Sequence, residues 1–203
     1  MLIDSKIYKQ FCKTKGGEMY KVIAFSSFSI MKKPYGDPVV AGFESLTPPV
    51  SQVVEQAKGF IARAKVTDNL EHLGNFERDW GAWGAFAVPD YYDGGLTSTD
   101  ETHAGTLSIW EDIESVHNFT YSGLHGIAFK QRHKWFREID YPTHVMWWIN
   151  RGETTTWKQS VACFDSLYAN GPTHLPSTFN ISLTVPATHS QVLTRRDDAW
   201  CVA

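Results

Sequence analysis

The stretch THVMWWIN at residues 143–150 decides the fold that the sequence predicts. Its bulky and β-branched residues favour a strand, in which successive side chains point to opposite faces. One face would carry Val145, Trp147 and Ile149, and the other would carry His144, Met146 and Trp148. Both sets are largely apolar, so we expect both faces of this strand to be buried.

The elements expected around this strand follow a known order. Three further strands are predicted at residues 20–30, 60–67 and 106–110, and helices are predicted within residues 38–59, 112–137 and 157–169. The order strand, helix, strand, strand, helix, strand is the split β-α-β arrangement of ferredoxin-like folds. The sequence therefore predicts an α+β protein with a four-stranded antiparallel sheet and helices on one face. The other face then needs a cover, which a second copy of the sheet would supply in a dimeric α+β barrel.

The chain of 203 residues is expected to hold one folded domain. We predict a flexible arm at residues 1–18, the α+β-barrel domain at 19–185 and a tail at 186–203. The segment at residues 68–102 is long for a connection and rich in aromatic residues. It is either a lid over a chamber or a segment that packs on its own sheet or on a partner, because so many rings would not stay in water.

Composition and charge exclude several classes of partner. The formal net charge of -3 argues against nucleic acid, which binds to basic surfaces. Residues 1–30 lack the apolar region of a secretory signal, and no apolar run is long enough to span a membrane. The three cysteines, Cys12, Cys163 and Cys201, are too few and too scattered for a disulfide framework or a zinc motif. The sequence therefore predicts a soluble, cytoplasmic protein without a nucleic-acid or membrane partner.

A set of short motifs gives the chain a family resemblance. They are LSIWE at 107–111, FTYS at 119–122, His125, RHKWF at 132–136, Trp147-Trp148, Gly152, Thr155, ANGP at 169–172 and Phe179. With this pattern the sequence resembles, over roughly residues 20–182, the family catalogued as domain of unknown function 3291. The resemblance implies a branch of the dimeric α+β barrels, and so a homodimer. Relatives of those barrels include antibiotic-biosynthesis monooxygenases, polyketide cyclases, muconolactone isomerases and haem-degrading enzymes.

Three side chains are the candidate catalytic groups: Tyr121, His125 and His144. Tyr121 and His125 are four residues apart, a spacing that puts two side chains on one helix face, although Gly123 interrupts it. A phenol beside an imidazole can transfer protons or orient a carbonyl group. The alternative is that Tyr121 packs under the sheet and His125 caps a helix turn.

The sequence predicts neither a metal nor another cofactor. His117, His125 and His133 recur every eight residues, which rotates each by about 80° from the last on a helix and is not a ligand spacing. The sequence also lacks a phosphate-binding loop, a nucleotide or flavin fingerprint and a nucleophile elbow.

Aromatic and basic side chains are the candidate substrate contacts. Trp110, Trp135, Trp148, Trp83 and Tyr91 are candidate walls of a chamber, and Arg63 could supply a positive charge for a carboxylate or enolate. Each has a simpler explanation, because large aromatic residues dominate protein cores and an arginine on a strand can lie on a solvated edge.

These observations predict a cofactor-independent enzyme of specialised, natural-product metabolism that acts on a hydrophobic small molecule in an aromatic-lined chamber. A cyclase, isomerase or pericyclase needs little more than a shaped site and a few hydrogen-bond donors. One alternative is a cofactor-free monooxygenase of the antibiotic-biosynthesis type, in which the substrate itself activates oxygen. The other is a non-catalytic dimeric module that only binds a small molecule.

Overall fold

The structure is a computed structural model that describes residues 20–67 and 74–171. The expected arm at 1–18 and tail at 186–203 lie outside the described residues. The described part holds one antiparallel sheet, made of β1 Lys21–Ile30, β2 Phe60–Arg63, β3 His103–Trp110 and β4 His144–Asn150. The strands are ordered β2-β3-β1-β4 across the sheet, so the predicted α+β, ferredoxin-like arrangement is confirmed.

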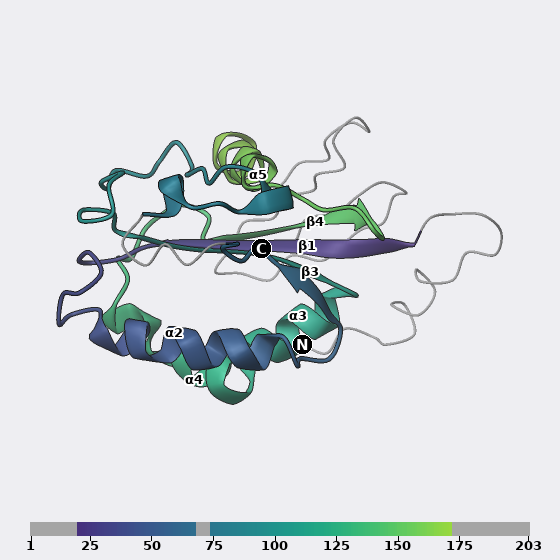
Figure 1. The fold of residues 1–203 in the computed structure, drawn as a ribbon, viewed down its shortest axis with the longest axis horizontal. Coiled ribbons are helices and arrows are strands. Elements are labelled where there is room, and N and C mark those ends of the chain that lie inside the picture. Colours follow the sequence, from purple (N-terminus) through teal and green to yellow (C-terminus); the bar gives the residue numbers. More distant parts are fainter. Residues whose placement is uncertain (1–19, 68–73, 172–203) are drawn as a thin grey trace.

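Helices lie on both faces of this sheet (Figure 1). The helices below it in Figure 1 are α2 Ala41–Val54, α3 Ile113–Tyr121 and α4 Gly123–Gln131, and the helix above it is α5 Trp157–Asn170. Three short 3-10 turns, Asn75–Glu77, Gly81–Trp83 and Arg132–Lys134, complete the described elements. The expectation of helices on one face is therefore wrong. The physical reason is that α5 carries its own apolar residues, which must be buried against a sheet face.

Local sequence signals determine where these helices begin. Asp112 Oδ1 accepts a hydrogen bond from the Ser115 N–H at 2.7 Å, and Thr156 Oγ1 accepts one from the Gln159 N–H at 3.2 Å. Both side chains therefore act as N-caps, of α3 and α5 respectively. Gly123 has a φ of 53°, a left-handed conformation that favours glycine, and it separates α3 from α4.

The sheet face toward α5 is buried by the chain itself. Its core contains Ala24, Phe28, Leu107, Val145 and Trp147 of the sheet, Trp157, Phe164 and Leu167 of α5, and Phe86 of the segment 74–102. Trp80, Trp83, Tyr91 and Tyr92 of the same segment pack against this core. A second copy of the chain is thus not required to cover this face. A homodimer stays a prediction.

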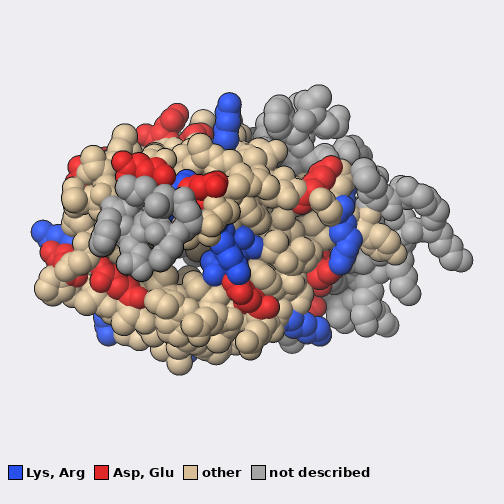
Figure 2. Space-filling model, in the orientation of Figure 1, with Lys and Arg blue, Asp and Glu red and all other residues tan. Residues whose placement is uncertain are grey.

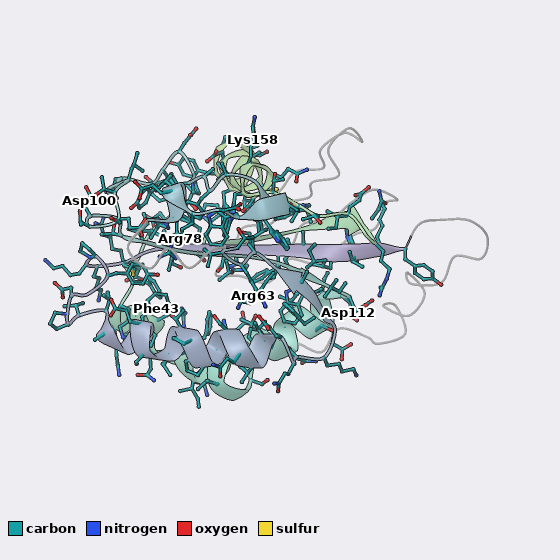
Figure 3. All side chains as sticks on the ribbon, viewed as in Figure 1. Phe43, Arg63, Arg78, Asp100, Asp112 and Lys158 are labelled. Carbon is teal, nitrogen blue, oxygen red and sulfur yellow. The ribbon has the colours of Figure 1, made fainter. Side chains whose placement is uncertain are left out.

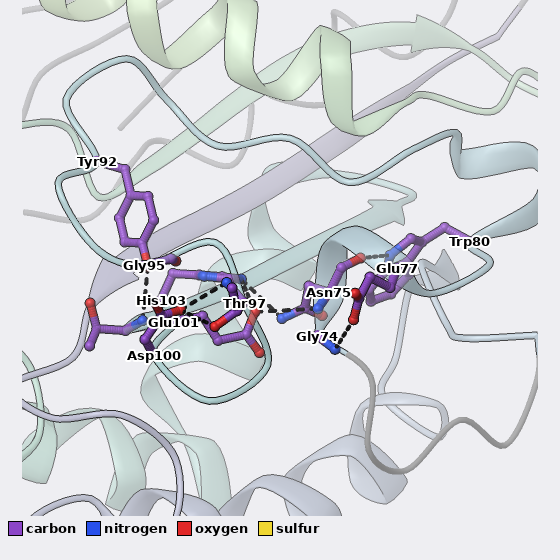
Figure 4. Close-up of polar contacts among 11 residues, drawn as sticks. Gly74, Asn75, Glu77, Trp80, Tyr92, Gly95, Thr97, Asp100, Glu101 and His103 are labelled. Atoms are coloured by element: carbon purple, nitrogen blue, oxygen red, sulfur yellow. Dashed lines mark hydrogen bonds and ion pairs between the residues drawn. The ribbon is translucent and has the colours of Figure 1, made fainter.

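Buried polar contacts fasten the segment 74–102 to the sheet (Figure 4). The Asn75 N–H donates to Glu101 Oε2 at 3.3 Å, and the Asn75 side-chain nitrogen lies 2.9 Å from His103 Nε2. The Asn75 carbonyl accepts a hydrogen bond from the Trp80 indole N–H at 3.0 Å. One residue therefore joins the segment to β3 and to its own aromatic rings. In this structure the segment is a packed cover of its own sheet, one of the roles that the sequence left open.

We expect Phe86→Ala to lower the free energy of unfolding by about 3–5 kcal/mol, since removing a buried aromatic ring leaves a cavity. Phe86 is 7% exposed, whereas Leu96 in the same segment is 59% exposed. The matched control Leu96→Ala should change the free energy by less than about 0.5 kcal/mol. Urea denaturation followed by tryptophan fluorescence measures both variants. Equally small effects would contradict a packed cover.

The buried imidazole of His103 should make the folded state sensitive to acid. Burial lowers the pKa of His103 from 6.5 to about 4. Between pH 6.5 and about 4 the unfolded chain binds a proton at this ring and the folded chain does not. The folded state therefore loses stability as the pH falls through this interval. At about 1.4 kcal/mol for each pKa unit, the loss from this group is at most about 3 kcal/mol.

The variant His103→Phe keeps a ring of similar shape among the neighbouring aromatic rings and removes the titrating group. The free energy of unfolding of this variant should fall less than that of the parent between pH 6.5 and 4. Burial raises the pKa of Glu101, which lies 3.9 Å from His103 Nε2, so Glu101 contributes with the opposite sign. Urea titrations at a series of pH values measure the difference, and parallel curves for the two proteins would contradict the assignment to His103.

Candidate functional site

The sheet face toward α2, α3 and α4 is apolar at its two ends. At one end lies a group of buried side chains, Ile23, Val54, Trp110, Val116 and Met146, called here the Trp110 cluster. At the other end lie Met31, Val40 and Trp135, called here the Trp135 cluster. Together the two clusters hold the helical layer against the sheet.

Between these clusters the middle of the face is polar. The strand register places Ser27 directly opposite Thr106 of β3 and directly opposite His144 of β4, so these three side chains form a row across the sheet. The neighbouring Ser26 points to the other face, where its hydroxyl accepts a hydrogen bond from Ser160 of α5 at 2.7 Å. The row therefore faces the layer formed by α2, α3 and α4.

Solvent reaches this row although helices lie over it. Thr106 is exposed, and Phe25, Ser27, Ser29 and His144 are half-buried. Figure 2 shows the surface hollowed between the sheet and the helical layer, beside a group of Lys or Arg side chains. The space bordered by these five residues is called here the interlayer cleft.

The roof of the interlayer cleft is α2, which does not fill it. Phe43, Leu46 and Val50 recur at helical spacing along α2 but stay half-buried, and among the residues of α2 only Val54 is buried. Trp135 separates α2 from the sheet at one end, where a Cβ on Gly42 would come within 2.9 Å of the indole Nε1. An indole between the two layers keeps them apart.

The interlayer cleft opens where β2 ends. Arg63, the last residue of β2, pairs with Ser108, whereas the sequence predicted a strand up to residue 67. Within the described residues β3 therefore lacks a neighbouring strand beside Thr106. Figure 3 places Arg63 between the sheet and α2, at this opening.

Two hydroxyl groups on the floor of the cleft can bind an oxygen atom of a ligand. Ser27 Oγ and Thr106 Oγ1 are 2.7 Å apart, so one hydroxyl donates a hydrogen bond to the other. The accepting hydroxyl keeps its own proton and can donate it to a further acceptor. This hydroxyl pair is therefore a ready donor for a carbonyl or enolate oxygen.

His144 can act as a base beside this pair. Burial lowers the pKa of His144 below its ordinary value of 6.5, so the ring is neutral at pH 7. Its ring centroid lies 6.4 Å from that of Phe25, and Nδ1 lies 3.4 Å from Thr143 Oγ1. A neutral imidazole offers one nitrogen that accepts a proton and one that donates.

His125 lies on the helical side, next to the Trp110 cluster. Its ring contacts Phe119 at 4.8 Å between centroids, and Phe119 contacts Trp110 at 5.4 Å. Because a carbonyl can only accept, His125 Nδ1–H donates to the Thr120 carbonyl at 2.9 Å, which leaves Nε2 as the basic nitrogen. Burial lowers the pKa of His125, and the bond to Thr120 offsets part of this effect.

The structure brings together some of the predicted site residues and separates others. His144, Trp148, Trp110 and Arg63 share the face of the sheet toward the helices, as the predicted alternation of residues 143–150 requires. Trp135 stands at the far end of that face and is buried. Trp83 and Tyr91 pack on the opposite face of the sheet. They therefore lie outside the interlayer cleft.

Tyr121 lies apart from the other candidate catalytic groups. It is 54% exposed, and its ring contacts His117 of its own helix and Phe129 of α4. Within the described residues no contact joins Tyr121 to His125, because the chain turns at Gly123 between their helices. Tyr121 and His125 therefore lie on different helices, and their four-residue spacing does not put them on one helix face.

Sequence reasoning missed the hydroxyl groups of the cleft. The strand at residues 20–30 carries three serines, and Ser27 and Ser29 fall on the face opposite Ser26. The available signal was the alternation of serines with large apolar residues in a strand that the topology places at the centre of the sheet.

Among residues 20–67 and 74–171, no group of three or more His, Cys, Asp or Glu side chains is placed to hold a metal ion. No helix of this part has the length and apolar character that a membrane span requires.

Sheet order and connectivity define the chain as an α+β protein of ferredoxin-like topology. A comparison with protein families matches residues 22–196 to the family described as a domain of unknown function, DUF3291, and the chain belongs to that family. The family expected from the motifs is therefore confirmed, and its place among the dimeric α+β barrels stays a prediction. Neither the search of curated proteins nor the search of solved structures found a match.

We expect His125 and His144 to be neutral at pH 7 and to titrate below pH 6.5, because burial disfavours the imidazolium. Nitrogen-15 NMR of the labelled imidazoles at a series of pH values measures both midpoints and both tautomers. His125 should carry its proton on Nδ1. A midpoint of 6.5 or above for His144, or an Nε2-protonated His125, would contradict the environments described.

Proposed function

We propose that this DUF3291 protein is a cofactor-independent enzyme that moves protons on a small, largely apolar molecule held in the interlayer cleft. The observation that carries the proposal is the solvent-reachable row of Ser27, Thr106 and His144 between the two layers. A sheet face with a purely structural role buries apolar side chains under its helices. Here the central positions are polar and open, which supports a site for a ligand.

The chemistry follows from the charge state of these groups. The neutral imidazole of His144 accepts a proton from a carbon next to a carbonyl group, while the hydroxyl pair of Ser27 and Thr106 donates to the carbonyl oxygen. His144 then returns the proton to a different atom of the enolate, which isomerises the molecule. If the enolate carbon first attacks a second carbonyl group of the same molecule, the carbon–oxygen π bond of that group breaks, and His144 gives the proton to the new alkoxide of the closed ring. General base catalysis of this kind contributes about a 10²–10⁴-fold rate increase.

The apolar borders of the cleft suit the body of such a molecule. Phe25 lies in the row next to the polar row, and Trp110 and Trp148 lie in the row beyond Phe25 on the same face of the sheet. Apolar walls hold a flexible substrate in its reactive conformation, which lowers the entropic part of the barrier. The family resemblance, which implies a branch of the dimeric α+β barrels whose relatives include cyclases and isomerases, also supports a cyclase or isomerase of natural-product metabolism.

Exchange of α-protons with solvent tests this proposal without knowledge of the natural substrate. The purified protein in D₂O should accelerate the exchange of 2-tetralone, an apolar ketone whose α-protons are readily followed by proton NMR. His144→Gln should lower the accelerated rate by about 100-fold, since it removes the base. The matched control is His133→Gln, because His133 is exposed and lies outside the cleft.

Other outcomes separate the alternative functions. Consumption of oxygen during turnover of a phenolic substrate would favour a cofactor-free monooxygenase. Binding of 2-tetralone that Thr106→Trp abolishes, without any proton exchange, would favour a module that only binds ligands. If the protein shows no proton exchange, and no binding of 2-tetralone that depends on Thr106, these results contradict a functional site in the interlayer cleft.

A further inference from the structure

We infer that the interlayer cleft selects molecules that carry a carboxylate, which Arg63 binds at the opening. A second oxygen of the same molecule then meets the hydroxyl pair of Ser27 and Thr106. This inference rests on the proposed function, because it takes the same cleft as the site. It adds the chemical class of the ligand and the direction in which the ligand lies.

The position of Arg63 puts its side chain on the face of the sheet that borders the cleft. Ala64, the next residue, belongs to the core on the other face, so the alternation of the chain turns Arg63 toward α2. The Arg63 side chain is 27% exposed, whereas that of Lys65 is 52% exposed. A guanidinium that is partly withdrawn from water interacts more strongly with an anion than a more exposed ammonium does.

Part of the guanidinium stays available for a ligand. Arg63 Nε and Nη2 both contact one oxygen, Glu55 Oε1, at 3.1 and 3.0 Å. Lys65 Nζ binds the same oxygen. Within the described residues the Nη1 group of Arg63 has no partner, and its two N–H donors are free to bind a planar anion.

The three linked side chains Arg63, Lys65 and Glu55 together carry one positive charge. The bonds from Lys65 and Arg63 lower the pKa of Glu55, so that carboxyl is ionised at pH 7. Two cations and one carboxylate therefore leave a net charge of about +1. This balance favours a monoanion such as a carboxylate over a phosphate dianion, which the nearby Glu55 would repel.

The distance between Arg63 and the hydroxyl pair indicates the size and shape of a ligand that contacts both. Arg63 pairs with Ser108, which follows Thr106 by two residues along β3, a separation of about 7 Å. Phe25 shares the row of Ser108 and turns its half-buried ring to the same face. An apolar ring system with a carboxylate at one end and an oxygen toward the other would match this order of charge, ring and hydroxyl pair.

The test compares an acid with its neutral analogue. The probes are 6-hydroxy-2-naphthoate and 6-hydroxy-2-naphthamide, whose fluorescence reports binding to the purified chain. The parent protein should bind the acid at least about tenfold more tightly than the amide, the range expected for a hydrogen bond to a charged group. Arg63→Met should abolish this preference and leave the affinity for the amide unchanged.

Two further variants control for indirect effects. Lys65→Met removes the more exposed of the two cations that bind Glu55. This variant should keep the preference for the acid over the amide. Glu55→Gln removes the negative charge beside Arg63 and should raise the affinity for the acid, a gain that loss of folding cannot produce. Circular dichroism confirms that each variant is folded.

The outcomes separate the inference from the proposed function. If the parent binds acid and amide equally, and Thr106→Trp blocks both, the cleft is a site but carboxylate selection is overturned. If the preference for the acid survives Arg63→Met, the inference is overturned in the same way. If neither probe binds in a manner that depends on Thr106, the inference and the proposed function fail together.

Discussion

The central strand β1 imposes the constraint on which the rest of this structure depends. It is hydrogen-bonded to β3 on one side and to β4 on the other, so each of its side chains must point to one of the two faces of the sheet. Ala24, Phe28 and Ile30 go to the face that α5 covers. Ser27 and Ser29 go to the face toward α2, α3 and α4, and this division makes one face a core and leaves polar groups open on the other, where we propose the site.

The buried face explains why the chain is built with such a long aromatic segment. A four-stranded sheet with three helices on one side leaves an apolar surface that water cannot be allowed to reach. Phe86 and Trp157 bring rings from two distant parts of the sequence onto that surface, 4.7 Å apart between centroids. The chain thus supplies in itself the cover that a dimeric barrel obtains from a second subunit.

The open face depends on two local features of the backbone. Gly59 has a φ of 77°, and a Cβ at this position would lie 2.1 Å from Ser115 Oγ, so glycine lets β2 enter the sheet close to α3. The register of β2 shifts between Phe60 and Ala62, and the strand ends at Arg63. A longer β2 would pair with β3 beside Thr106. Its early end opens the cleft and leaves an arginine at the opening.

Sequence alone determined the order of the elements and the alternation that puts His144 and Trp148 on one face. These features depend on neighbours within a few residues, for which pattern and side-chain chemistry are sufficient. Tertiary structure decided that the segment 74–102 is a cover, that Tyr121 faces solvent, and that Ser27, Thr106 and His144 meet in one open row. Each of those outcomes depends on groups far apart along the chain. The local conformational preferences of a serine or a tyrosine are the same whether its side chain is buried under a helix or exposed to solvent.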